Sequence, residues 1–83
     1  MTSVNGIKAT DIAEETKRII ADTYELPKNC IEETDKFSDL GDSLEAIEAQ
    51  GRIEDEFHIT FPEADVKKFI TVGDLIAYLK ENL

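Results

Sequence analysis

The stretch Phe37-Ser38-Asp39-Leu40-Gly41-Asp42-Ser43-Leu44-Glu45 joins a segment of turn-forming residues to a run with helical periodicity. Asp42 can cap a helix through its carboxylate, and Glu45, three residues later, can accept a hydrogen bond from the Asp42 amide. This spacing predicts a helix that begins at Ser43 and leaves the serine hydroxyl in solvent. The unpaired N–H groups and the positive dipole end of a helix start suit a phosphate on that oxygen.

The residues after Ser43 predict an amphipathic helix that ends at about Phe57. At the helical period of about 3.6 residues, its buried side comprises Ala46, Ala49, Ile53 and Phe57. Leu44, Glu48, Arg52 and Asp55 point outward, and Ile47 lies at the boundary. The outward side carries an exposed stripe, which we define as Leu44, Glu45, Ile47, Glu48 and Asp55.

Two more long helices and one short helix are expected. The first long helix runs from Asp11 to about Tyr24, capped by Thr10 or Asp11, with one face formed by Ile12, Ala13, Thr16, Ile19, Ile20 and Thr23. Pro62 suits the first turn of a short helix from roughly Glu63 to Phe69 that presents Val66 and Phe69 inward. A capping box of Thr71 and Asp74 starts the last helix, whose buried face comprises Val72, Leu75, Ile76, Leu79 and Leu83.

These segments predict an all-α fold, because no β-hairpin signal competes with them. We expect a four-helix bundle of three longer helices and one short helix, with a long loop between the first and second helices. Loops of this length are usually functional or pinned by apolar side chains, and Ile31, Phe37 and Leu40 could serve as anchors.

Composition limits the class of protein and of partner. With 83 residues the chain suits one domain, and 19 acidic against 9 basic residues give a net charge of -10. Such a charge disfavours nucleic acid and anionic membranes and favours basic protein surfaces. Cys30 is the only cysteine and is expected to pack beside Ile31, so no internal disulfide can form. With no leader and no membrane span in the sequence, we expect a cytoplasmic monomer.

Two other kinds of site are disfavoured by the residues themselves. Gly41-Asp42-Ser43-Leu44 also spells the nucleophile block of the GDSL-type esterases, but the only histidine is His58, roughly 20 Å along the same helix. No Ser-His pair can form, and His58 better suits a left-handed helix end. Asp35, Asp39 and Asp42 do not make a calcium loop, because the central glycine is missing, so no metal is predicted.

The pattern around Ser43 resembles that of the acyl carrier protein family. The resemblance extends over most of the chain, through Phe37, Asp39, Leu40, Gly41, Asp42, Ser43, Leu44, Glu45, Glu48, Ile53, Glu54-Asp55-Glu56-Phe57, Ile59, Pro62 and Thr71-Val72-Gly73-Asp74. It implies a single acyl-carrier-like domain over residues 1–83, which is not an enzyme. It also implies that a phosphopantetheinyl transferase attaches 4′-phosphopantetheine from coenzyme A to Ser43, and that the arm carries acyl groups as thioesters.

The same resemblance implies partners with basic patches, among them the transferase and acyl-processing enzymes of fatty acid, lipid or polyketide synthesis. The residues expected to bind them are Asp42, Leu44, Glu45, Ile47, Glu48 and Asp55. The chain departs from the family in its shortened Gly41-Asp42 junction, in Ala49, Gln50 and Gly51 where bulky apolar residues are usual, and in Arg52 where a small residue is usual. An unmodified acidic helical interaction module is therefore the alternative.

Overall fold

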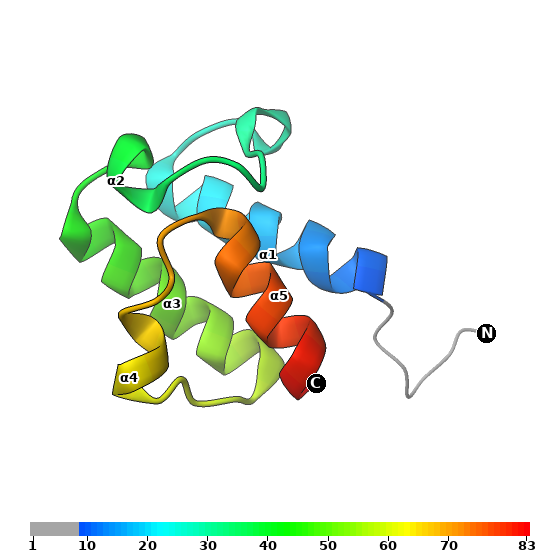
Figure 1. The fold of residues 1–83 in the computed structure, drawn as a ribbon. Coiled ribbons are helices and arrows are strands. Elements are labelled where there is room, and N and C mark those ends of the chain that lie inside the picture. The colour runs from blue at the N-terminus through cyan, green and yellow to red at the C-terminus, as the bar shows by residue number, and fades with distance from the viewer. Residues whose placement is uncertain (1–8) are drawn as a thin grey trace.

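The computed structural model describes residues 9–83, where five α-helices and one 3₁₀ helix account for the regular structure (Figure 1). They are α1 (Ala9–Tyr24), η1 (Lys28–Cys30), α2 (Phe37–Leu40), α3 (Ser43–Phe57), α4 (Glu63–Val66) and α5 (Val72–Asn82). Within these residues the only extended pairing is an isolated bridge between Lys36 and Thr71. The all-α prediction is confirmed, while η1 and α2 lie inside the segment predicted as a plain loop.

Helix α1 begins earlier than the sequence indicated. Because it starts at Ala9, neither Thr10 nor Asp11 is its N-cap, and that prediction is wrong. Alanine is the best helix former, so the helix extends beyond the expected cap, and Asp11 lies in its first turn. The C-terminal end is closed by Glu25 in the left-handed conformation and by a hydrogen bond from the Leu26 amide to the Ala21 carbonyl, 2.8 Å long.

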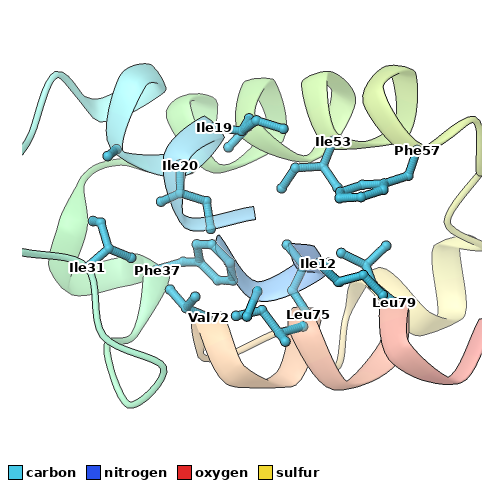
Figure 2. Packing of buried hydrophobic residues seen from close by; sticks show 14 of the residues in the cluster. Ile12, Ile19, Ile20, Ile31, Phe37, Ile53, Phe57, Val72, Leu75 and Leu79 are labelled. Atoms are coloured by element: carbon cyan, nitrogen blue, oxygen red, sulfur yellow. The ribbon is translucent and has the colours of Figure 1, made fainter. Parts of the chain in front are cut away.

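The core lies where α1 packs against both α3 and α5 (Figure 2). Its completely buried members include Ile20 from α1, Ile53 from α3, and Leu75, Ile76 and Leu79 from α5. Burying an aliphatic side chain of this size contributes roughly 1.5 to 3 kcal/mol, so this three-helix junction provides most of the apolar stabilisation. The predicted inward faces of the three long helices are confirmed, except that Thr23 is only partly buried and that Leu83 follows the end of α5 and is half exposed.

The segment between α1 and α3 is fastened at several points. Ile31 and Phe37 are buried and Leu40 packs against the core, which confirms the predicted anchors. Figure 2 shows Phe37 directed toward Ile20 and Val72 in the core. Cys30, in contrast, is exposed rather than packed beside Ile31, because η1 turns its side chain toward solvent.

Short helix α4 is one turn long and does not reach Phe69 as predicted, since the chain continues from Val66 as a turn. Val66 and Phe69 are nevertheless partly buried against the core, as expected. The rings of Phe61, Phe69 and Tyr78 meet edge to face, with centroids 5.2 to 5.5 Å apart. These aromatic contacts fasten the α4 segment to α5.

Candidate functional site

The start of α3 has the capping box that the sequence predicts. The Asp42 carboxylate accepts a hydrogen bond from the Glu45 amide at 3.0 Å, and the Glu45 carboxylate accepts one from the Asp42 amide at 3.2 Å. Ser43 is therefore the first residue of the helix, and its side chain is exposed. The other end of α3 is also as predicted, with His58 in the left-handed conformation.

Two backbone N–H groups in the first turn of α3 are free to bind an anion. Within residues 9–83 the amides of Ser43 and Leu44 have no hydrogen-bond acceptor, whereas the Glu45 amide is taken by Asp42. These free donors lie at the positive end of the dipole of a 15-residue helix. The serine hydroxyl is thus placed where a phosphate ester would gain both hydrogen bonds and a favourable field.

Gly41 makes room for this arrangement. Its backbone is extended, so its conformation does not require glycine, but a side-chain carbon at this position would collide with the Glu45 carboxylate. The ring of Tyr24, the last residue of α1, lies 3.6 Å from the same position. Gly41 therefore lets Glu45 fold back onto the Asp42 amide.

Tyr24 packs beside Gly41 at the edge of the site, and the sequence analysis did not identify it as part of the site. The side chain is buried, and its hydroxyl has no hydrogen-bond partner among residues 9–83. Burial raises the pKa of Tyr24 above its ordinary value of 10.0, and the nearby carboxylates of Glu45 and Asp42 raise it further. The phenol is therefore neutral at physiological pH and acts as an apolar support for the loop.

The exposed stripe on α3 is largely as predicted. Leu44 and Ile47 are 75% and 63% exposed, and Glu48 and Asp55 also face solvent. Glu45 is only half exposed, because its carboxylate is held in the capping box. Asp42 to Glu48 lie within two turns of Ser43, whereas Asp55 lies roughly 18 Å from Ser43 along the helix axis. The site is therefore concentrated at the start of α3.

Arg52 is not a free outward residue as the helical projection suggested. Its guanidinium donates to the Asp22 carboxylate at 2.7 Å and to the Thr23 hydroxyl at 2.9 Å, and thereby joins α3 to the end of α1. Gln50, which the projection placed toward the buried side, is half-buried. The unusual residues of α3 thus include one with a clear structural function.

A groove of about 390 Å³ adjoins the start of α3. It is lined by Phe37, Ser38, Gly41, Asp42, Ser43 and Ala46, so the serine forms part of its wall. No helix in residues 9–83 is both long and apolar enough to cross a membrane. In the same part of the chain, no three His, Cys, Asp or Glu side chains are grouped to hold a metal ion.

Comparison with known proteins identifies the class. A family model described as "Phosphopantetheine attachment site" matches residues 14–79. The chain is 36% identical over 74 residues to an acyl carrier protein of Lactobacillus acidophilus, covering 87% of this chain and 92% of that protein. It is 32% identical over 73 residues to an acyl carrier protein of Wolinella succinogenes, covering 86% and 96% respectively.

A solved structure agrees with these sequence relatives. The NMR structure of the HMG-ACPI domain from the CurA module of Lyngbya majuscula superimposes with a TM-score of 0.79 at 26% identity. The match covers 100% of this chain and 86% of that domain. The chain belongs to the acyl carrier protein family.

Membership has two consequences for the chemistry. The protein is a carrier and not an enzyme, and its prosthetic group is a covalently attached 4′-phosphopantetheine. The residues at the start of α3 fit such a group, because an exposed hydroxyl stands beside two free N–H donors. Its phosphate would also lie at the favourable end of the helix dipole.

Proposed function

We propose that Ser43 is the attachment residue and that residues 1–83 act as a single carrier domain for acyl groups. The observation that supports this most strongly is the exposed Ser43 hydroxyl at the first position of α3, beside the free amides of Ser43 and Leu44. A transferase would form a bond from the serine oxygen to the pantetheine-bearing phosphorus of coenzyme A. The serine proton is lost, the pyrophosphate bond breaks, and adenosine 3′,5′-bisphosphate leaves.

The attached group supplies a terminal thiol that holds acyl groups as thioesters. The chain itself supplies a fixed anchoring point, because the capping box holds the backbone around Ser43 in one conformation. The free amides and the helix dipole stabilise the negative phosphate without a basic side chain. We propose that the cargo serves fatty acid, lipid or polyketide synthesis.

The proposed partner-binding residues are Asp42, Leu44, Glu45, Ile47, Glu48 and Asp55. Leu44 and Ile47 offer apolar contacts that are already exposed, and the acidic groups around them suit basic patches on the transferase and the acyl-processing enzymes. Exposed ion pairs contribute only about 0.2 to 1 kcal/mol each, so we expect weak, salt-sensitive docking. We also propose that the protein works as a monomer in the cytoplasm, where a lone exposed thiol stays reduced.

Intact-mass measurement tests the attachment. After incubation with coenzyme A and a broad-specificity phosphopantetheinyl transferase, the protein should gain the mass of one phosphopantetheinyl group. Ser43→Ala should gain nothing, while Ser38→Ala, which changes another exposed serine nearby, should be modified like the wild type. An unmodified wild type, or modification of Ser43→Ala, would overturn the proposal and favour the unmodified interaction module.

A charge reversal tests the docking surface separately. Glu48→Lys should slow modification by about 2- to 10-fold, because it removes an attraction and adds a repulsion beside Ser43. Glu81→Lys is the matched control, since Glu81 is exposed on α5 and forms no ion pair within residues 9–83. Equal rates for the two variants would show that overall charge, rather than the stripe on α3, attracts the partner.

A further inference from the structure

Gly51 lies between Glu48 and Asp55 on the exposed stripe of α3, and no contact within residues 9–83 requires a glycine there. A side-chain carbon at this position would meet nothing within 4 Å outside its chain neighbours and the backbone of α3. Its backbone is helical, without the positive φ that favours glycine. Glycine in a helix interior is less stable than alanine, so Gly51 has a cost that no internal contact explains. The open space is therefore available to a partner.

Two long side chains next to this space are held away from it. The guanidinium of Arg52, the next residue, is bound to the end of α1 by hydrogen bonds of 2.7 and 2.9 Å. The carboxylate of Glu54, three residues after Gly51, accepts a hydrogen bond from the Phe61 amide at 2.7 Å. Both side chains are therefore directed to the sides of α3, and the helix surface between them stays open. We call this open surface the Gly51 gap.

The remaining neighbours of Gly51 determine what the gap can receive. Neighbours on a helix surface lie three and four residues away, and here they are Ile47, Glu48 and Asp55. Ile47 is 63% exposed and gives the gap an apolar wall. Glu48 and Asp55 are exposed, and in residues 9–83 neither forms an ion pair. The Gly51 gap therefore combines apolar surface with two unpaired negative charges.

We propose that Gly51 determines partner specificity, because the Gly51 gap receives a bulky apolar side chain that a partner helix carries between two basic residues. Glu48 and Asp55 are seven residues apart, roughly 10 Å along the helix axis. A partner helix that lies along α3 matches this spacing when its basic residues are also seven positions apart, with the apolar residue midway. The proposal rests on the proposed function, in which this side of α3 binds the partners, and it adds the chemistry of the partner's contact.

Shape and solvation favour this occupant over a smaller or a polar one. A small side chain would leave the Gly51 gap unfilled and would lose dispersion contacts with Ile47. An uncharged polar side chain would lose hydration against Ile47 without gaining a hydrogen bond from that wall. A carrier with a large side chain in place of Gly51 would exclude the same partner residue. The gap therefore discriminates between partners by shape as well as by charge.

Titration of two short helical peptides into isotope-labelled protein, followed by amide chemical shifts, tests the proposal. Both peptides carry lysines seven positions apart, and the residue midway between them is leucine in one peptide and alanine in the other. The leucine peptide should bind about 3- to 10-fold more tightly, with the largest shifts at Ile47, Gly51 and Asp55. Equal affinities, no binding of either peptide, or largest shifts on another helix would overturn the proposal.

Filling the Gly51 gap should remove the preference for leucine. Gly51→Leu should bind the two peptides equally, whereas Ala77→Leu, at an exposed position of α5, is the matched control and should keep the wild-type ratio. Gly51→Ala should raise the melting temperature and yet lower the preference, which a purely structural role of the glycine would not do. If Gly51→Ala weakened the binding of both peptides alike, the glycine would act through the flexibility of α3, and the proposal would be wrong.

Intact-mass measurement separates this proposal from the proposed function. A protein that gains the phosphopantetheinyl group at Ser43 but shows no preference for the leucine peptide would overturn the role of the Gly51 gap alone. A protein that is never modified but prefers the leucine peptide would overturn the carrier function and support the gap.

Discussion

The starts of α3 and α5 are built with the same capping box but differ in what lies over them. At α5 the Thr71 hydroxyl accepts from the Asp74 amide at 3.1 Å, and the Asp74 carboxylate accepts from the Thr71 amide at 3.0 Å. The residue after the cap is Val72, which is completely buried, whereas the corresponding residue of α3 is the exposed Ser43. The cap thus fixes where each helix begins but not what its first residue does.

The free amides of the two helices show the cause of this difference. In α5 the Val72 amide donates to the Asp35 carbonyl at 2.9 Å, and the Gly73 amide donates to the Glu33 carbonyl at 2.8 Å. The chain's own loop therefore occupies the start of α5, while the corresponding donors of α3 have no acceptor within residues 9–83. A helix start becomes a binding site only where no other part of the chain covers it.

The largest expected difference between the two starts concerns their first residues. Val72→Ser should lower the free energy of unfolding by about 2 to 4 kcal/mol, because it removes buried apolar surface and buries a hydroxyl. Ser43→Val should change it by less than about 0.5 kcal/mol, since that side chain is exposed. Urea denaturation measures both values, and equal losses would contradict the comparison.

Removing either cap should have a smaller effect. Thr71→Ala and Asp42→Ala should each destabilise the protein by about 1 kcal/mol, because each leaves one first-turn amide without its acceptor. Only Asp42→Ala should also slow the proposed modification of Ser43, since only that cap fixes the backbone around the serine. Thermal denaturation and a timed intact-mass assay give the two readouts. Slow modification of Thr71→Ala would show that the effect is one of general stability.

Replacing Gly41 and Gly51 by alanine should distinguish the glycine that makes room for the capping box from the one that contacts nothing. A side-chain carbon at Gly51 meets nothing within 4 Å, so Gly51→Ala should stabilise α3 by about 0.5 to 1 kcal/mol. Gly41→Ala should destabilise the protein, by less than Asp42→Ala, because it displaces the Glu45 carboxylate from the capping box. Opposite shifts in melting temperature are expected, and a gain at Gly41 would contradict this role for the glycine.

The smallest expected effect is a dependence of folding stability on acidic pH that comes from Asp74 at the start of α5. Amide donors at Thr71 and Ile70 hold the pKa of Asp74 below its ordinary value of 3.8. The unfolded chain then binds the proton more readily, so this contribution is complete above pH 3.8 and is lost as the pH falls through the lower folded value. Asp74→Asn should reduce the loss of stability below pH 3.8 in urea titrations. An unchanged acid dependence would show that other carboxylates cause it.

The features that sequence predicted well depend on contacts between near neighbours. Both capping boxes join residues three positions apart, so their sequence spacing determines them. The bounds of α3 and the left-handed His58 follow in the same way from local preferences. The candidate site was predictable to this extent because Ser43 lies directly after one of these boxes.

Features that depend on distant contacts were not predictable. Arg52 finds its partners in Asp22 and Thr23, 30 and 29 residues away, and Tyr24 reaches Gly41 only after α1 and α3 have packed. The short helices η1 and α2 consist of single turns, which are too brief to show a helical period. The groove beside Ser43 needs the same packing, since its inner wall, Phe37, is held by Ile70.

The hydrogen bonds between the loop and α5 also join two segments that lie far apart in the sequence. Hydrogen bonds from the Phe37 amide to the Ile70 carbonyl and from the Val72 amide to the Asp35 carbonyl hold residues 35–37 against residues 70–72. Residues 38–69, which include Ser43 and all of α3, form a long loop between these two segments. Because α3 packs against α1, and Ala49 and Ile53 are completely buried in the core, this loop cannot separate from α1 without exposing the core. In native-state hydrogen exchange we therefore expect the Val72 and Gly73 amides to open together with the core amides of α3. Closing this long loop thus makes α3 part of one cooperative unit with α1 and α5.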